Sequence, residues 1–164
     1  MHIAVINGPN LNLLGVREPE RYGTTSLDQI EQQVRARDRA LKVNIASWMQ
    51  SNHEGVLVDA VQALRGSADG ALINAGAYTH TLLALRDAVL AARVPFVEVH
   101  LTNVFAREEL RRHSVLADLA IGVIAGFGAD SYLLGLEALV GALRKTHKTR
   151  KTHKTRPMRP VRHS

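Results

Sequence analysis

Short apolar runs alternate with longer amphipathic segments along most of the chain, and this alternation limits the folds that the chain can adopt. Five of the runs read as buried strands, at about residues 2–7, 43–48, 70–74, 95–99 and 118–124. Segments with helical spacing of apolar residues follow them, at about 26–41, 54–65, 80–90, 107–112 and 129–143. The pattern predicts an α/β fold, with a parallel sheet covered by helices on both faces.

The connections restrict the topology further. Right-handed crossovers between parallel strands favour a flavodoxin-like, doubly wound, five-stranded parallel sheet with strand order 2-1-3-4-5. In that order the crevice of the sheet lies between its first and third strands, at their carboxyl ends. Ser26, followed three residues later by Gln29, has the pattern of a capping box at the start of the first long helix.

The positive charge of the chain is concentrated at its C-terminal end. Nine of the 21 lysines and arginines lie after residue 143, in a stretch without acidic residues, which leaves 12 basic against 15 acidic residues in 1–143. The first 143 residues therefore carry a formal charge of −3, although the whole chain carries +6. We expect a single catalytic domain over 1–143 and a basic, disordered tail over 144–164. Such a tail is usually solvated, and a contact with nucleic acid is the alternative.

Composition and motifs exclude several kinds of function. Cysteine is absent, which removes disulfides, thiolate catalysis and cysteine-ligated metals and is compatible with a reducing, cytoplasmic location. No apolar run is long enough to span a bilayer, and the apolar N-terminus reads as a strand rather than a signal peptide. Neither a phosphate-binding nor a dinucleotide-binding glycine motif follows the first strand, and no His-Glu-x-x-His zinc motif occurs. Lys42 is the only lysine before residue 144 and lies at the back end of the second strand, which disfavours Schiff-base catalysis.

Polar side chains gather after three of the expected strands, within residues 7–23, 74–80 and 98–103. The carboxyl ends of parallel strands lie at one edge of a sheet, so these three clusters can meet in a single crevice. The stretch 8–24 is rich in glycine, proline and asparagine and is long for a loop in a compact domain, which makes it a candidate lid.

Two pairs of residues in these clusters suit acid–base chemistry. Arg17 shares a loop with Tyr22, and a nearby guanidinium favours the phenolate, which makes a tyrosine a usable general base. The alternative is a packed tyrosine ring beside a surface arginine. Glu98 lies two residues before His100 on the same strand face, where a carboxylate fixes the imidazole tautomer and suits the ring to act as a general acid. A purely structural His–Glu pair is the alternative here.

Further residues of the clusters are candidates for binding a carboxylated, polyhydroxylated small molecule. The strand exit at Leu101 and Thr102 offers backbone N–H groups and a hydroxyl to a carboxylate. Asn12 and Asn74 carry amides that can orient water or hydroxyl groups, although a lone loop asparagine is more often a turn residue.

Two more groups of charged residues are placed by the expected helices. His80 and Asp87 fall on one helix face two turns apart, too far to bond directly, so Asp87 could serve a neighbouring subunit instead. Helix capping by His80 and a solvated Asp87 are the alternatives. Arg107, Arg111 and Arg112 flank the loop after the fourth strand, and the spacing makes Arg107 and Arg111 neighbours on one helix face.

Three motifs carry a family resemblance. Residues 7–23 read Asn-Gly-Pro-Asn-Leu-Asn-Leu-Leu-Gly-Val-Arg-Glu-Pro-Glu-Arg-Tyr-Gly and look like the opening signature of the type II 3-dehydroquinate dehydratases. Residues 73–80, Ile-Asn-Ala-Gly-Ala-Tyr-Thr-His, and 97–103, Val-Glu-Val-His-Leu-Thr-Asn, look like the second and third motifs of that family. The resemblance covers about residues 1–143.

The resemblance implies a cofactor-free anti elimination of water from 3-dehydroquinate, which gives 3-dehydroshikimate through an enolate in aromatic biosynthesis or, in some organisms, in quinate breakdown. In this reading Tyr22 is the base that removes a proton next to the ketone, and Arg17 favours its ionised form and stabilises the transition state. Asn12 holds the enolate oxygen through a water molecule. His100, oriented by Glu98, protonates the departing hydroxyl.

The same resemblance implies a substrate-binding set and an assembly. The binding residues are Asn74, His80, Asp87, Leu101, Thr102 and Arg111, with Asp87 reaching in from an adjacent subunit. Members of the family form trimers packed into a dodecamer, and neither a metal nor an organic cofactor is implied. Phe105 stands where the family usually has histidine, and no role is assigned to it. A flavodoxin-like module that binds a nucleotide or flavin is the alternative function.

Overall fold

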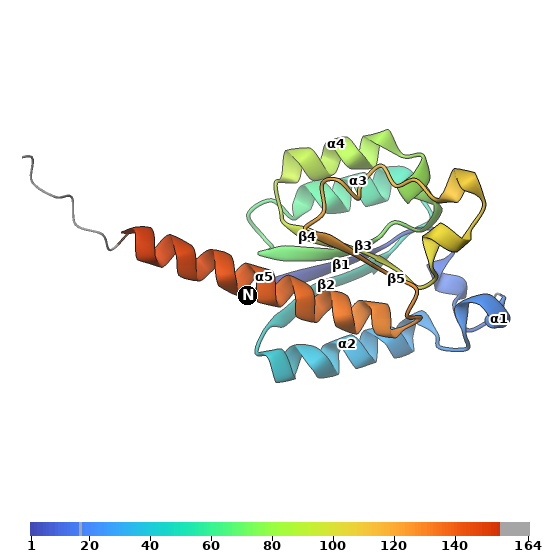
Figure 1. The fold of residues 1–164 in the computed structure, drawn as a ribbon, viewed down its shortest axis with the longest axis horizontal. Helices are drawn as coiled ribbons and strands as arrows, with labels where there is room; N and C mark the ends of the chain where they lie inside the picture. Colours follow the sequence, from blue (N-terminus) through green and yellow to red (C-terminus); the bar gives the residue numbers. More distant parts are fainter. Residues whose placement is uncertain (17, 155–164) are drawn as a thin grey trace, which may run out of the picture.

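The computed structural model describes residues 1–16 and 18–154, and a five-stranded parallel sheet forms its centre (Figure 1). The strands are β1 His2–Asn7, β2 Asn44–Gln50, β3 Gly70–Asn74, β4 Phe96–His100 and β5 Gly122–Ala125. Every neighbouring pair is parallel, and the spatial order is β2-β1-β3-β4-β5. The doubly wound order predicted from the sequence is confirmed.

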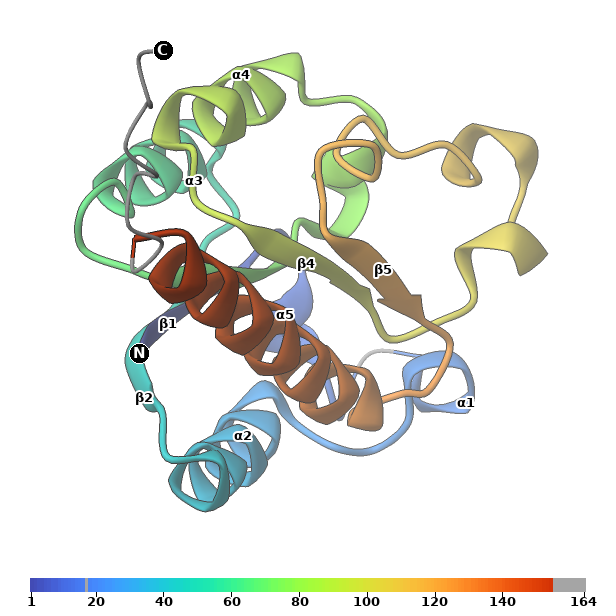
Figure 2. The same cartoon turned by 60° about the vertical axis from the view of Figure 1, so that its left-hand side comes forward.

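Helices cover both faces of this sheet. α2 Leu27–Leu41 and α5 Asp130–Lys154 pack on one face, and α3 Glu54–Ala63 and α4 Leu83–Ala92 pack on the other, as the two views in Figures 1 and 2 show. Shorter elements follow three of the strands: η1 Leu11–Leu13 and α1 Pro19–Tyr22 after β1, η2 Gly76–His80 after β3, and η3 Val104–Ala106 and η4 Glu109–Arg111 after β4. These short elements are the ones that can shape a site at the carboxyl ends of the strands.

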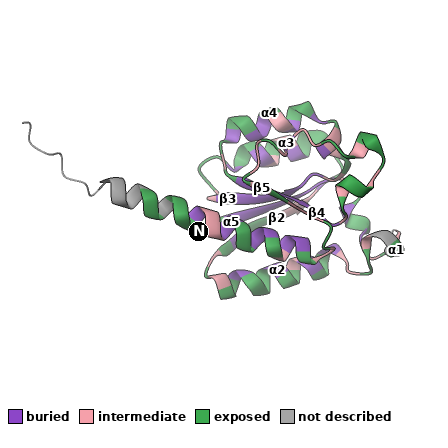
Figure 3. Cartoon of the chain, viewed as in Figure 1, coloured by how far each residue is buried: buried purple, intermediate pink, exposed green. Residues whose placement is uncertain are grey.

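The core consists of two apolar layers, one on each face of the sheet. Ile3 and Val5 of β1 pack with α2 and α5, whereas Ala4 and Ile6 pack with α3 and α4, because successive side chains of a strand point to opposite faces. β3 and β4 are buried along their whole length (Figure 3). Burial on both faces explains why these strands are mostly apolar in the sequence, apart from Asn74, Glu98 and His100.

The capping box predicted at the start of the first long helix is present. Ser26 Oγ accepts from the backbone N–H of Gln29 at 3.2 Å, and Gln29 Oε1 accepts from the backbone N–H of Ser26 at 2.9 Å. The two bonds satisfy donors that the helix itself leaves unpaired and fix where the loop after β1 ends.

Several predicted boundaries differ from the structure, and hydrogen bonds or backbone conformation explain three of them. The helix expected from His80 starts instead at Leu83, since the N–H groups of residues 81 and 82 both bond to the Tyr78 carbonyl and close a turn. Of the helix expected over 107–112, only the turn η4 Glu109–Arg111 forms, because Arg107 caps η3 in an extended conformation. The last strand starts at Gly122 rather than near 118, since the N–H groups of residues 119 and 120 bond back to Leu116.

The last helix is longer than predicted. It continues to Lys154, so the disorder expected from residue 144 is not found in residues 144–154. Lysine and arginine are good helix formers, and no glycine or proline interrupts the chain between Ala142 and Lys154. The remainder of the expected tail, 155–164, lies outside the described residues.

Candidate active site

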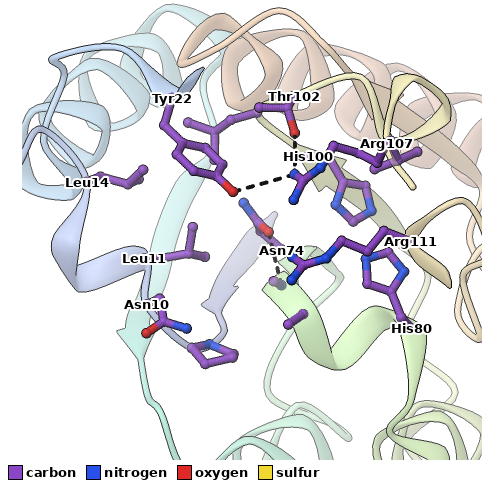
Figure 4. Close-up of a pocket in the computed structure, with 15 residues that line it drawn as sticks. Asn10, Leu11, Leu14, Tyr22, Asn74, His80, His100, Thr102, Arg107 and Arg111 are labelled. Atoms are coloured by element: carbon purple, nitrogen blue, oxygen red, sulfur yellow. Dashed lines mark hydrogen bonds between the residues drawn. The ribbon is translucent and has the colours of Figure 1, made fainter. Parts of the chain in front are cut away.

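A crevice opens at the carboxyl ends of β1, β3 and β4, where the three polar clusters of the sequence meet (Figure 4). Its lining consists of Pro9, Asn10, Leu11, Leu14, Tyr22, Asn74, Gly76, Ala77, His80, His100, Leu101, Thr102, Val104, Arg107 and Arg111. Seven predicted site residues are in this lining, namely Tyr22, Asn74, His80, His100, Leu101, Thr102 and Arg111. The fold thus brings together side chains that are far apart in the chain.

Tyr22 reaches the crevice from the end of α1 and faces a guanidinium there. Its phenolic oxygen lies 3.5 Å from Arg107 Nη1, and the same nitrogen lies 3.5 Å from Thr102 Oγ1. The Arg107 side chain is only 13% exposed, and its Nε has no hydrogen-bond acceptor among the described residues, with Glu108 Oε2 at 3.6 Å. A cation in this position stabilises negative charge on the phenolic oxygen.

His100 and Glu98 form a buried pair at the end of β4. His100 Nε2 lies 2.8 Å from Glu98 Oε1, and the Glu98 side chain has no exposed surface. Within the described residues no hydrogen bond reaches the other ring nitrogen, Nδ1. The pair therefore fixes the ring by one nitrogen and leaves the second for a molecule in the crevice.

Glu98 is held ionised although it is buried. Burial alone raises the pKa of its carboxyl, but hydrogen bonds from His100, Thr79 and Ser114 outweigh burial and bring this pKa below its ordinary value. Thr79 Oγ1 donates to Oε1, and Ser114 Oγ lies 2.8 Å from Oε1 and 3.0 Å from Oε2. An ionised Glu98 accepts the hydrogen on Nε2 and stabilises a positive charge on His100.

Asn74 is fixed from behind by a buried tyrosine of α5. Its Nδ2 donates to the Tyr132 hydroxyl at 2.9 Å, and that hydroxyl donates to Asn7 Oδ1 at 2.6 Å. The amide oxygen of Asn74 accepts from the backbone N–H of Gly76 at 3.2 Å. Burial raises the pKa of Tyr132 and outweighs the opposing bond from Asn74, so the hydroxyl stays protonated. The amide of Asn74 thus has one defined orientation.

Two further lining residues carry nitrogen donors at the opposite side of the crevice from Tyr22 (Figure 4). His80 Nδ1 lies 2.7 Å from the carbonyl oxygen of His113 and so carries a hydrogen, which leaves Nε2 for a ligand. Arg111 extends from η4, with its Nε 2.7 Å from Glu108 Oε1. Each side chain is thus held by one nitrogen, His80 Nδ1 or Arg111 Nε, and its other nitrogens can bind a ligand.

Four predicted site residues are not in the lining of the crevice. Glu98 lies behind His100, as described above. Asn12 lies in η1, where its Oδ1 accepts from Gln50 Nε2 at 3.4 Å. Asp87 is exposed on α4 and does not reach the crevice of its own chain. Arg17 lies outside the described residues, so its predicted pairing with Tyr22 stays a prediction.

Four residues that shape the site were not predicted as site residues. Arg107 appeared only as part of an expected helix, whereas Thr79 and Ser114 contact Glu98 from separate segments. Tyr132 lies on the buried side of α5 and reads as an ordinary core residue in the sequence. Only Arg107 carried a usable signal, as a cation just past the third motif.

Proton transfer is the chemistry that this lining offers. A phenol beside a guanidinium and an imidazole backed by a carboxylate both reach the crevice, which provides a base and an acid. In residues 1–16 and 18–154, no three His, Asp or Glu side chains gather in a way that could hold a metal ion. None of the helices in that part of the chain combines the length and the apolar character needed to cross a membrane.

The fold and this lining define a doubly wound α/β protein with an acid–base site at the carboxyl ends of its strands. Residues 1–140 match the family model described as dehydroquinase class II. The chain belongs to this family, which confirms the resemblance found in the three sequence motifs. The alternative of a nucleotide- or flavin-binding module has no support from this match.

Similar proteins come from several bacteria. A relative from Yersinia enterocolitica is 52% identical over 146 residues, which cover 89% of this chain and 97% of the relative. A relative from Trichodesmium erythraeum is 54% identical over 143 residues, which cover 87% of this chain and 95% of the relative. Both carry the name 3-dehydroquinate dehydratase. The crystal structure of the type II dehydroquinase from Butyrivibrio crossotus aligns with a TM-score of 0.80 at 38% identity, over 84% of this chain and 96% of that one.

Proposed function

We propose that this chain is a 3-dehydroquinate dehydratase, a hydro-lyase that removes water from 3-dehydroquinate to give 3-dehydroshikimate. The observation that carries the proposal is the family match over residues 1–140, together with relatives of that name at more than half identity. The crevice supplies what such an elimination needs, because a base reaches it from α1 and an acid from β4. Aromatic biosynthesis is the pathway that we infer, and the cytoplasm is the location that we infer.

The proposed reaction has two proton transfers. The Tyr22 phenolate takes a proton from the carbon next to the ketone, and the electrons of the broken C–H bond form an enolate. The enolate then collapses, the bond between carbon and the leaving hydroxyl breaks, and His100 donates the proton that turns this hydroxyl into water. Glu98, 2.8 Å from His100 Nε2, stabilises the imidazolium before the transfer. Anti elimination requires that the base and the acid act from opposite faces of the substrate ring.

Two arginines take part in the proposed stabilisation of charge. Arg107 lies 3.5 Å from the Tyr22 oxygen and favours its negative form. We assign to Arg17 the same effect on Tyr22 and the stabilisation of the transition state, as the family resemblance implies. Asn12 is assigned to the enolate oxygen, through a water molecule.

The remaining predicted residues are proposed to bind the substrate. Asn74, His80, Leu101, Thr102 and Arg111 line the crevice and offer amide, imidazole, backbone, hydroxyl and guanidinium groups to hydroxyls and a carboxylate. Asp87 is exposed on α4, and we propose that it enters the crevice of an adjacent subunit. The assembly that we propose is the dodecamer of four trimers that the resemblance implies, with no cofactor.

The direct test is turnover of 3-dehydroquinate by the purified protein. The product is a conjugated enone, so ultraviolet absorbance is expected to rise with time. Tyr22→Phe is expected to abolish the rise while the circular dichroism spectrum and oligomeric state stay unchanged. Borohydride added with substrate is expected to leave the activity intact, because no imine forms. A folded oligomer without turnover would contradict the proposal.

A further inference from the structure

Two hydroxyl groups from separate segments converge on the carboxylate behind His100. Thr79 belongs to η2, which follows β3, and Ser114 lies after η4, whereas Glu98 is in β4. Thr79 Oγ1 bonds to Glu98 Oε1, and Ser114 Oγ lies 2.8 Å from Oε1 and 3.0 Å from Oε2. With His100 Nε2, three donors surround a carboxylate that has no exposed surface.

Both hydroxyl groups donate their hydrogens to the Glu98 carboxylate. Ser114 Oγ accepts from the backbone N–H of Leu116 at 3.0 Å and of Ala117 at 3.1 Å, which uses both of its lone pairs. Ser114 Oγ also lies 3.0 Å from Thr79 Oγ1, but it has no lone pair left to accept from Thr79. The Thr79 hydrogen therefore points at Glu98, and Ser114 Oγ donates to Glu98 Oε1 at 2.8 Å. This arrangement suits the ionised carboxylate, which only accepts.

The segment that carries Ser114 is clamped in place. Arg86 of α4 donates to the carbonyl of Val115 at 2.6 Å and pairs with both carboxylate oxygens of Asp118, at 2.5 and 2.8 Å. The backbone N–H of Val115 donates to the carbonyl of Thr79 at 2.8 Å. The two hydroxyls are thus fixed relative to each other and to Glu98 before any ligand arrives.

The surroundings of His100 are rich in positive charge. Arg107 and Arg111 line the crevice with His100, and Arg112 lines a second hollow that also includes His100 in its lining. The other titratable or charged groups that line the two hollows are Tyr22, His80, Arg86, His113 and Asp118. Asp118 is engaged by Arg86. Glu108 lies 2.7 Å from Arg111 and 3.6 Å from Arg107. Glu98 is the carboxylate that hydrogen-bonds to His100 itself, and its negative charge favours the protonated ring.

We propose that Thr79 and Ser114 are positioning residues that keep Glu98 ionised and thereby keep His100 a competent acid. Neither side chain is in the lining of the crevice, so both act through Glu98 rather than on the substrate. The proposal rests on the function proposed above, in which His100 protonates the leaving hydroxyl.

The cleaner test is Thr79→Val, which keeps the shape of a fully buried side chain and removes only its hydroxyl. Glu98 then ionises less readily, so His100 loses its proton at lower pH. The basic limb of the pH profile of kcat is expected to move to lower pH by roughly one unit, with little change in KM. Thr79→Ser, which restores the hydroxyl, is expected to restore the profile.

Ser114→Ala is the second variant, and it also removes the acceptor for the N–H groups of Leu116 and Ala117. Ser114→Thr keeps the hydroxyl and is expected to rescue the profile. Ser67→Ala serves as the matched control, because among the described residues the exposed Ser67 Oγ bonds only to the carbonyl of Ala63, at the end of α3. Thermal melts identify any variant that fails to fold.

A readout without substrate separates this proposal from the proposed function. Only the neutral imidazole reacts with diethyl pyrocarbonate, so the pH dependence of His100 modification, followed by peptide mass spectrometry, reports when the ring loses its proton. This dependence is expected to move to lower pH by roughly one unit in Thr79→Val. An unchanged profile and unchanged modification in folded Thr79→Val would overturn the proposal. A shifted modification in a protein that does not turn over 3-dehydroquinate would overturn the function and leave the network standing.

Discussion

Arg107 Nη1 lies 3.5 Å from the hydroxyl oxygen of Tyr22, although the two residues are 85 positions apart in the chain. The contact joins the loop after β4 to α1 across the mouth of the crevice (Figure 4). It places a nearly buried cation beside the group that we assign as the base, where it stabilises the charge that this group must carry.

Arg107→Ala is expected to lower kcat on 3-dehydroquinate by about 10²–10³-fold, the usual effect of removing one preorganised donor from a developing charge. Arg107→Lys keeps the charge but not the planar fork, and its kcat is expected to lie between those of the wild type and Arg107→Ala. Steady-state kinetics at several pH values provide the measurement. Arg65→Ala, at an exposed arginine beyond the end of α3, is the control, and an Arg107→Ala enzyme with the same kcat as this control would contradict the prediction.

Tyr132→Phe is expected to destabilise the fold by about 1–3 kcal/mol, because it leaves the amides of Asn7 and Asn74 without their shared partner in the core. The KM for substrate is expected to rise as well, since Asn74 loses its fixed orientation. Denaturant unfolding and steady-state kinetics give the two measurements. Tyr78→Phe removes a hydroxyl that bonds to the Asn52 carbonyl at a more exposed position, and it is expected to cost less. Equal costs for the two variants would count against the buried link.

Glu98→Gln is expected to change how stability depends on pH. The pKa of Glu98 is lowered in the folded protein, so its ionisation stabilises the fold fully above the ordinary value of about 4.3 and loses this effect as pH falls below that value. The difference in melting temperature between wild type and Glu98→Gln is therefore expected to be largest near neutral pH and to shrink in the acid range. Glu54→Gln on the surface of α3 controls for the loss of one negative charge. A difference that stays constant from neutral to acid pH would show that ionisation of Glu98 does not contribute.

Truncation after Lys145 is expected to leave turnover and melting temperature unchanged. Leu143, the last core residue of α5, is retained, and so is Arg144, whose Nη2 donates to the carbonyl of Leu41 at 2.5 Å. The residues removed lie beyond the body of the protein in Figure 1 as far as the structure describes them. A loss of activity in a folded truncated protein would assign residues 146–164, the C-terminal extension, a role in catalysis or assembly.

The contact of this extension with nucleic acid stays a separate prediction. Of the nine basic residues after residue 143, seven are removed by the truncation. If the extension contacts phosphates, the full chain binds duplex DNA or RNA with an affinity that falls steeply with salt, and the truncated chain does not. Fluorescence anisotropy at two salt concentrations measures this. Equal binding by both proteins would exclude the extension as the contact.

The element types follow from periodicity. The strands at 2–7 and 70–74 have the predicted bounds, because each begins and ends at a polar residue or glycine. Arg107 was harder to place, since the spacing predicted it inside a helix over 107–112, whereas it lies between η3 and η4 in an extended conformation. Thr79 and Ser114 are 35 positions apart and uncharged, so no local pattern links them to Glu98. Asp87 is exposed on α4, and its contact with a neighbouring subunit stays a prediction, because the packing of one chain does not record contacts between subunits.

The bond from Tyr132 to Asn7 ties one of the last elements of the chain to the first strand. During synthesis β1 and β3 leave the ribosome long before α5, so Asn7 and Asn74 are made before the Tyr132 hydroxyl that orients them. A nascent chain that ends before Tyr132 contains the crevice residues but lacks the hydroxyl that orients Asn74. The protein is therefore expected to acquire binding competence late in translation, in one step, when its C-terminal helix docks.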